Sequence, residues 1–235
     1  MRVVGLFDNR ADWLAARRDG LGASDIAALF GLSPYATPWS VYVDKIGATP
    51  LDEDSTEQME WGQDLERIIL DRWEKRTGLH ATDRGLLVCH DDHPWMMASL
   101  DALCVDDDGN ELAVVEAKHT QDWSWDDGIP LHYAAQAQWQ MMVTGHDRVV
   151  FAVSHRGLRL GVYELEADYD DQAALQRIAT DFWHNHVQAG VAPAVEAADN
   201  ERLAKVWPDA ADETVEVDAD LVAELVDVKA QQKIL

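Results

Sequence analysis

Cysteine is scarce in this sequence, which holds only Cys89 and Cys104 among 235 residues. Two thiols are too few for a disulfide framework, a four-cysteine zinc site or a four-cysteine iron–sulfur cluster. Long apolar runs are missing too. No stretch of about 18 residues is apolar enough for a membrane span, and the opening MRVVGLFDNR does not resemble a signal peptide. These absences predict a reduced protein of the cytoplasm, with no membrane among its partners.

Positive charge is the other shortage. Lysine and arginine number 19 against 44 acidic residues, which gives a formal net charge of −25. Proteins that bind nucleic acid usually carry a basic face, so this balance argues against a broad binding surface of that kind. The first fifty residues qualify the argument, because basic and acidic residues balance there and the whole acidic excess lies beyond them.

Apolar residues make up 47% of the chain, which suits one large domain or a domain with an appendage. Apolar periodicity and cap residues predict helices at 9–18, 25–31, 39–47, 58–77, 131–144 and 169–188. Alternation predicts strands at 84–90, 98–105, 111–118, 148–154 and 158–165, with a hairpin over the Asp-Gly turn. Residues 190–217 read as a linker or irregular wrapping before a last helix from Asp218. The mixture indicates an α/β (α+β) protein.

Ionisable residues interrupt two of these apolar strands. Glu116 and Lys118 are two apart, so both side chains emerge on the same face, and Asp101 lies on the partner strand of the hairpin. Two carboxylates beside a lysine suit Mg²⁺ or Mn²⁺, with a cation that orients or deprotonates a water. A surface ion pair on a half-exposed hairpin explains the same residues when they are taken alone.

Two helices carry polar residues beside their apolar faces. Glu66 lies among Gly62, Ile69 and Trp73 at helical neighbour spacings, and Gln136 has a similar placement on the helix after the hairpin. Either residue alone is more often found at a helix boundary than in a site. The order of acidic helix, Asp strand, Glu-x-Lys strand and Gln helix is much harder to attribute to chance.

Four collinear blocks carry a resemblance to the YqaJ-type viral recombinase nucleases, relatives of the phage lambda exonuclease within the PD-(D/E)XK superfamily. It runs from about Trp13 to Val153 and comprises ARRDGLGASDIAALFGLSPYATPWSVYVDKIG, WGQDLERIILDRW, ASLDA with VVEAK, and YAAQAQWQMMVTG. The resemblance implies a restriction-endonuclease-like core, with a mixed central sheet flanked by helices. Together with the acid-rich composition of the C-terminal part, it predicts an exonuclease domain at 1–189, whose first 57 residues form a helical DNA-end-binding part, and an acidic C-terminal extension with a terminal helix at 190–235.

The resemblance also implies roles for individual residues. Asp101 and Glu116 would be metal ligands with the backbone carbonyl of Ala117, and Lys118 would activate or position the attacking water. Glu66 would support a second metal or its water shell, and Gln136 would complete the site. Mg²⁺ is the implied cofactor, with Mn²⁺ as a substitute. The family commonly has glycine after the catalytic Asp, where this chain has Ala102.

A separate site is expected near the N-terminus. Ser24 is predicted to cap a helix whose N–H groups favour an anion, and Arg17 and Arg18 precede it closely. An ordinary cap beside two solvated arginines is the simpler explanation. The resemblance implies that Arg17 and Ser24 grip the 5′-phosphate of a DNA end, and the seven-residue separation from Ser24 favours Arg17 over Arg18.

The function implied by the resemblance is a Mg²⁺-dependent 5′→3′ exonuclease. It would act on double-stranded DNA ends in phage-type recombination, leave a 3′ single strand for an annealing protein, and form a trimer in the bacterial cytoplasm. One alternative is a nicking or structure-specific endonuclease of the same fold. A second is a non-catalytic acidic interaction protein or DNA mimic, against which the intact Asp101, Glu116 and Lys118 argue.

Overall fold

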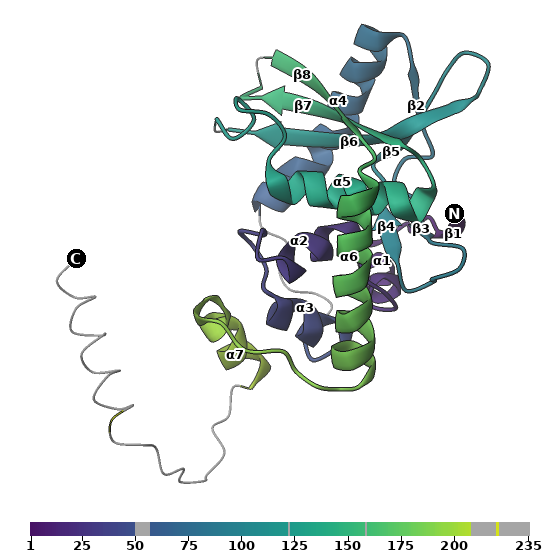
Figure 1. Cartoon of the computed structure of the whole chain (residues 1–235). Coiled ribbons are helices and arrows are strands. Elements are labelled where there is room, and N and C mark those ends of the chain that lie inside the picture. The colour runs from purple at the N-terminus through teal and green to yellow at the C-terminus, as the bar shows by residue number, and fades with distance from the viewer. Residues whose placement is uncertain (50–56, 122, 158, 208–219, 221–235) are drawn as a thin grey trace, which may run out of the picture.

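The structure is a computed structural model that describes residues 1–49, 57–121, 123–157, 159–207 and 220. Its centre is a mixed five-stranded sheet of order β2-β5-β6-β7-β8 (Figure 1). The strands are β2 (His80–Thr82), β5 (Ala102–Val105), β6 (Glu111–Thr120), β7 (Arg148–His155) and β8 (Arg159–Glu166). Only β6 and β7 pair in parallel among these neighbours. The predicted mixed central sheet is confirmed.

Helices cover both faces of this sheet. The helices are α1 (Arg10–Arg17), α2 (Ala23–Leu29), α3 (Pro38–Lys45), α4 (Glu57–Thr77), α5 (Leu131–Thr144), α6 (Tyr169–Phe182) and α7 (Asn200–Val206). Val115 of β6 packs in one apolar cluster with Trp73 of α4, whereas its neighbour Val114 packs in another with Trp139 of α5. Successive side chains of a strand point to opposite faces, so α4 and α5 lie on opposite sides of the sheet.

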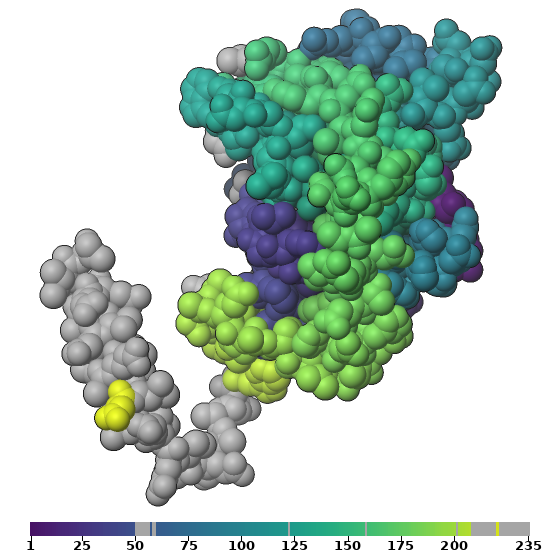
Figure 2. Space-filling model, viewed as in Figure 1, coloured from purple at the N-terminus to yellow at the C-terminus, as the bar shows by residue number. Residues whose placement is uncertain are grey.

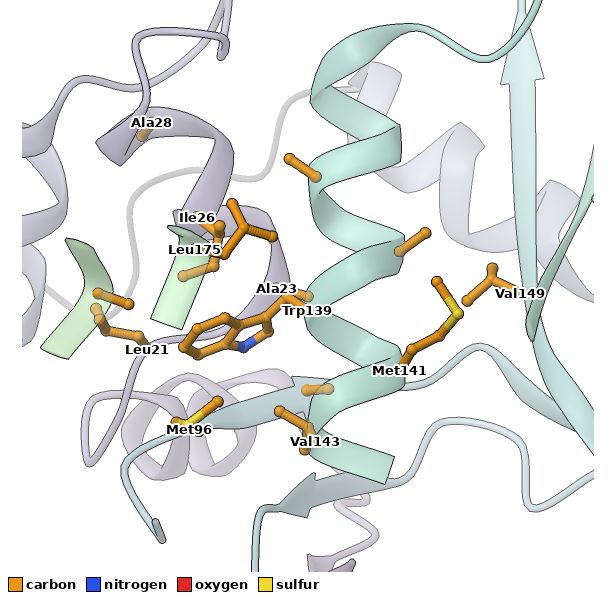
Figure 3. Packing of buried hydrophobic residues seen from close by; sticks show 14 of the residues in the cluster. Leu21, Ala23, Ile26, Ala28, Met96, Trp139, Met141, Val143, Val149 and Leu175 are labelled. Atoms are coloured by element: carbon orange, nitrogen blue, oxygen red, sulfur yellow. The ribbon is translucent and has the colours of Figure 1, made fainter. Parts of the chain in front are cut away.

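Helix α5 joins the sheet to the N-terminal helices. Trp139 is fully buried in one apolar cluster with Ile26 of α2 and Leu175 of α6, and its indole N–H donates to the Met97 carbonyl at 3.0 Å. On the other side of the helix, Met141 reaches Val149 of β7 (Figure 3). Removing an indole of this kind typically costs about 3–5 kcal/mol of stability. Both sides of α5 are therefore packed, and its position against β6 is fixed.

The predicted strand at 98–105 is wrong in one respect that matters for the site. The chain forms β4 (Met97–Ser99) and then β5, and the two strands belong to different sheets. β4 joins β3 (Leu87–Cys89) and β1 (Arg2–Gly5) in a three-stranded sheet. The predicted hairpin is confirmed for β5 and β6, where Ala102 pairs with Val115. Strands as short as β1 and β2 hold too few alternating positions to be predicted from sequence.

The predicted helix at 169–188 changes type along its length. It is α-helical to Phe182 and continues as a π-helix, η1 (Trp183–Gln188). Trp183 stacks on Trp95 there, with ring centroids 6.0 Å apart and an interplanar angle of 10°.

No helix among the described residues is long and apolar enough to cross a membrane.

Part of the acidic extension packs on the N-terminal helices. A short 3-10 helix, η2 (Ala197–Asp199), and α7 lie beside α3, and Figure 2 shows this yellow-green segment against the purple one. The Thr37 hydroxyl donates to the Asp199 carboxylate, and the Trp207 ring centroid lies 5.8 Å from that of Trp39. Residues 190–207 thus wrap the core. The predicted terminal helix lies outside the described residues, apart from position 220.

Candidate active site

Asp101 lies where the chain passes from one sheet to the other. It falls between β4 and β5, and its Oδ2 accepts the Ala117 N–H of β6 at 2.8 Å. Burial, followed by the negative charge of Glu116, raises the pKa of Asp101 well above its usual range. Ala102 begins β5 in ordinary register with Val115 and is not among the residues of positive φ, so the position does not require glycine.

Glu116 and Lys118 emerge on the same face of β6, as their spacing predicts. The Lys118 Nζ lies 2.6 Å from Glu116 Oε1, and the Glu116 side chain is 3% exposed. Burial opposes the charge on Lys118, but Glu116 and Asp101 outweigh it and raise the lysine's pKa. Lys118 is therefore an ammonium at neutral pH, a group that donates hydrogen bonds and does not accept a proton.

Glu66 reaches the site from α4. Burial and the nearby Glu116 raise the pKa of its carboxyl group. Glu66 lines a cleft of about 930 Å³ together with Asp101, Lys118, and Trp13 of α1. The structure therefore brings the three predicted carboxylates and the lysine into one region. Glu66 comes from α4, Asp101 from the link between β4 and β5, and Glu116 and Lys118 from β6.

Two glutamines of α5 hold the Glu116 carboxylate from the other side. Gln136 Nε2 donates to Oε1 and Gln140 Nε2 donates to Oε2, both at 2.6 Å. Gln136 was predicted from the sequence as a site residue, whereas Gln140, which has no exposed surface, was not. Gln140 follows Gln136 by four residues and so lies on the same helical face, a spacing that is compatible with a shared partner but does not identify one.

The donor set suits a divalent cation. Three carboxylates face one ammonium, and carboxylate oxygens are the ligands that Mg²⁺ and Mn²⁺ prefer. Burial, followed by the negative charge of Glu116, raises the pKa values of Asp101 and Glu66, so a bound cation would stabilise their charged forms. The fit is one of donor chemistry and not of spacing, because among the described residues no three His, Cys, Asp or Glu side chains are grouped closely enough to hold a metal ion. Lys118, Gln136 and Gln140 occupy both oxygens of Glu116, so an ion would take over part of their role.

Arg17 and Ser24 also meet, but not through the expected cap. Arg17 Nη2 donates to Ser24 Oγ at 2.9 Å, and the guanidinium lies 4.5 Å from the centroid of the Trp13 ring. The prediction that Ser24 caps the helix is wrong, because α2 begins at Ala23 with Gly22 as its N-cap. The Asp25 carboxylate accepts the Gly22 N–H at 2.8 Å and leaves the Ser24 hydroxyl directed at Arg17. Since Trp13 lines the cleft, the Arg17–Ser24 pair adjoins it.

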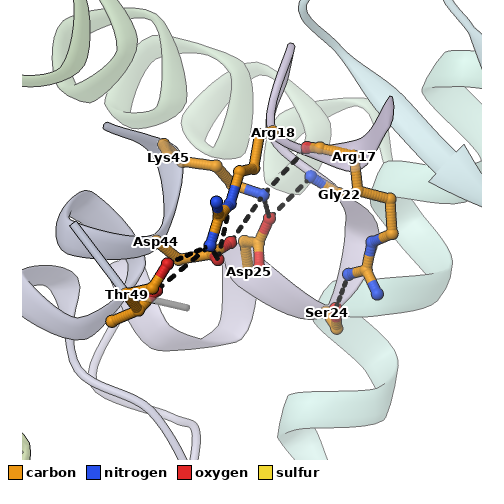
Figure 4. A network of polar contacts seen from close by, with 8 residues as sticks. All are labelled: Arg17, Arg18, Gly22, Ser24, Asp25, Asp44, Lys45 and Thr49. Atoms are coloured by element: carbon orange, nitrogen blue, oxygen red, sulfur yellow. Dashed lines mark hydrogen bonds and ion pairs between the residues drawn. The ribbon is translucent and has the colours of Figure 1, made fainter. Parts of the chain in front are cut away.

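A buried ion pair fixes the backbone beneath Arg17 (Figure 4). Lys45 Nζ lies 2.8 Å from Asp25 Oδ2 and donates to the Arg17 carbonyl at 3.1 Å. Burial opposes the charge of Asp25, but Lys45 and then Arg17 outweigh it and lower the pKa of that carboxyl. Arg18 donates instead to Asp44 and to the Thr49 carbonyl. Of the two arginines, Arg17 is thus the one directed at Ser24.

Comparison with known proteins identifies relatives. Residues 12–147 match the YqaJ-like viral recombinase domain. The "Uncharacterized protein YqaJ" of Bacillus subtilis (strain 168) is 30% identical over 196 residues, which cover 81% of this chain and 60% of the relative. The chain therefore spans about 60% of that protein's length.

Solved structures share the fold. An alkaline exonuclease from Laribacter hongkongensis is 22% identical with a TM-score of 0.63, over 83% of this chain and 98% of that one. Its complex with dAMP gives 23% identity and a TM-score of 0.64, over 82% and 97%. A putative exonuclease from Eubacterium rectale gives 12% and 0.54, over 91% and 97%. The chain belongs to the YqaJ-like viral recombinase family and has the PD-(D/E)XK exonuclease fold.

Proposed function

We propose that this protein is a Mg²⁺-dependent exonuclease that degrades one strand of linear double-stranded DNA from its 5′ end. The observation that carries the proposal is that Asp101, Lys118 and Glu66 line one cleft, with Glu116 buried beside Lys118. Membership in a viral recombinase family supports it, as do the relatives of this fold that are named alkaline exonucleases.

The carboxylates would hold the metal. Asp101 and Glu116, with the Ala117 carbonyl, are the proposed ligands, and Glu66 would support a second ion or its water shell. When bound, Mg²⁺ neutralises phosphate charge and makes water a better nucleophile near neutral pH. Mn²⁺ should substitute because it accepts the same oxygen ligands.

The remaining residues would orient the reactants. The raised pKa of Lys118 keeps it charged, so its ammonium can donate to a phosphate oxygen or to the attacking water. Gln136 keeps the Glu116 carboxylate in place through its 2.6 Å hydrogen bond. These groups need no rearrangement of solvent as charge develops on the phosphate, which is how a preorganised site accelerates a reaction.

Arg17 and Ser24 would bind the terminal 5′-phosphate. A guanidinium offers a planar fork of donors that suits a phosphate, and the Ser24 hydroxyl adds another donor beside it. The pair adjoins the cleft through Trp13, so a phosphate held there would have its neighbouring phosphodiester near the carboxylates. This arrangement favours cleavage that starts at a DNA end.

Family resemblance supports the wider context of the proposal. The product would be a 3′ single strand for a single-strand annealing protein in phage-type recombination, within the cytoplasm of a bacterial host. The protein would work as a trimer around DNA. Sedimentation of the full chain at several concentrations would test the assembly.

Digestion of two DNA forms tests the activity. We expect Mg²⁺ to support loss of a 5′-phosphorylated linear duplex while the same DNA as a covalently closed circle stays intact. Asp101→Asn should abolish the loss, and Asp108→Asn, a change in the exposed turn, should not. Nicking of the circle would favour the endonuclease alternative. A folded wild-type protein that cleaves neither form would favour the non-catalytic one.

A further inference from the structure

Gln140 is a buried polar residue whose side-chain amide donates to Glu116. It has no exposed surface, its Nε2 donates to Glu116 Oε2 at 2.6 Å, and the Ser99 carbonyl lies 3.4 Å from the same nitrogen. Its own Oε1 is buried with no hydrogen-bond partner in the described part of the chain. An amide buried with one side unsatisfied costs free energy, so packing alone does not account for it.

The two oxygens of Glu116 have different neighbours. Oε1 is shared by Gln136 and by Lys118, which lines the cleft. Oε2 lies on the fully buried side, against Gln140. Helix α5 is packed on both sides through Trp139 and Met141 (Figure 3). This packing holds the Gln140 amide in place behind the carboxylate.

We infer that Gln140 is a positioning residue for Glu116. It holds Oε2 from behind, so that Oε1 is the oxygen presented to a divalent cation, and it touches neither the cation nor DNA. The inference rests on the proposed function, since it assumes that Glu116 is a ligand. Hydrogen bonds that orient a metal's ligands typically contribute about 10–100-fold in metal affinity or activity.

Gln138 provides a matched control on the same helix. It is 4% exposed, donates to the Glu166 carbonyl at 2.9 Å, and accepts from the Asp168 N–H and from Gln172. Its contacts tie α5 to the start of α6 and do not include Glu116. Replacement of Gln138 should therefore lower stability without affecting a cation at the cleft.

Titration of the full chain with Mn²⁺, followed by calorimetry, separates the two roles. The double variant Asp101→Asn/Glu116→Gln defines weak binding to surface carboxylates. Above that background, we expect Gln140→Leu to weaken Mn²⁺ binding by about 10–100-fold and Gln138→Leu to keep wild-type affinity. At saturating Mn²⁺, Gln140→Leu should recover most of the wild-type cleavage rate, because the ligand itself remains.

Unchanged Mn²⁺ affinity in folded Gln140→Leu, with normal binding by the wild type, would overturn this inference alone. Equal weakening by Gln138→Leu would overturn it too, because the effect would then be general destabilisation. Absence of Mn²⁺ binding above background in the wild type would reject the proposed function instead. If Gln140→Leu does not fold, Gln140→Met gives the same test, since methionine keeps the length and flexibility but lacks the donor.

Discussion

Two clusters of charged side chains in this protein differ in their balance of positive and negative groups. The carboxylate cluster consists of Glu66, Asp101, Glu116 and Lys118, and the basic cluster of Arg17, Arg18, Asp25, Asp44 and Lys45. Three negative groups face one positive group in the first, whereas three positive groups face two negative ones in the second. Burial raises the pKa of Asp101, but Lys45 and Arg17 overcome burial and lower the pKa of Asp25.

Both carboxyl groups are buried, yet the pKa of one is raised and the pKa of the other is lowered. The charges of the neighbouring side chains account for the difference. In the basic cluster each buried acid has a cation, so the network stabilises the turn between α1 and α2. The carboxylate cluster is short of positive charge, which an added cation would supply. The basic cluster has one positive charge in excess, and Arg17 is the member that donates to Ser24. The first cluster thus suits a cation and the second an anion.

Breaking the basic cluster should have the largest effect. Lys45→Met leaves Asp25 buried without its main partner, and loss of one partner of a buried pair typically costs about 3–5 kcal/mol. Urea unfolding measures the change in the free energy of unfolding. Lys45→Met/Asp25→Asn should recover part of the loss. If Lys45→Met lowers the free energy of unfolding by less than about 1 kcal/mol, the value typical of exposed ion pairs, the network does not stabilise the turn between α1 and α2.

Loss of any central member of the carboxylate cluster should abolish cleavage. Asp101→Ala and Glu116→Ala remove proposed ligands, and Lys118→Ala removes the cation that orients the reactants. Each should lower the Mg²⁺-dependent rate by about 100-fold or more while circular dichroism shows a folded protein. Near-normal turnover by Glu116→Ala, with an unchanged metal requirement, would show that the site is assigned wrongly.

Arg17 should govern the choice of DNA end. Arg17→Ala should remove a preference for 5′-phosphate over 5′-hydroxyl ends of about tenfold or more, the size expected from hydrogen bonds to a charged group. Arg17→Lys should restore it only in part, because lysine lacks the bidentate geometry. Initial rates on paired substrates measure the preference, and Mn²⁺ affinity should be unaltered. If the wild type shows no preference for 5′-phosphate over 5′-hydroxyl ends, Arg17 does not bind the terminal phosphate.

The smallest effect should be a gain in stability that depends on pH. The folded-state pKa of Asp101 is raised, so folding opposes its ionisation, and the penalty grows as pH rises above the unfolded value of about 3.9. Asp101→Asn should raise the Tm by about 2–4 °C near pH 8, if about 1 kcal/mol is released. The gain should vanish near pH 4. Scanning calorimetry without divalent cations at both pH values checks this, and an equal gain at the two would contradict it.

Local patterns predicted one part of the site and failed at another. The shared face of Glu116 and Lys118 follows from the period of a strand, and the structure has it. The break at Asp101 did not follow, because its strand-like sequence continues through a crossing between sheets that only tertiary packing creates. The resemblance selected Asp101 correctly as a member of the cluster without indicating that geometry.

The roles of two further residues, Ser24 and Gln140, depend on tertiary contacts that the sequence does not show. Ser24 is a good cap residue by type, but Gly22 is the N-cap of α2, and Asp25 accepts the Gly22 N–H while buried Lys45 holds that carboxylate from another helix. Gln140 stands among apolar residues of α5, where a polar residue is ordinarily taken as a boundary position. Its role depends on its contact with buried Glu116 of the neighbouring strand, and no local sequence pattern encodes that contact.

The order in which labels leave a linear duplex tests the account most directly. One strand of a 5′-phosphorylated duplex carries a label at its 5′ end or, in a parallel reaction, at its 3′ end, and both are digested with Mg²⁺. We predict that the 5′ label is released first, as a mononucleotide, and that the 3′ label stays on a steadily shortening strand. Asp101→Asn should release neither label. Earlier loss of the 3′ label, or internal fragments from both substrates, would contradict the account.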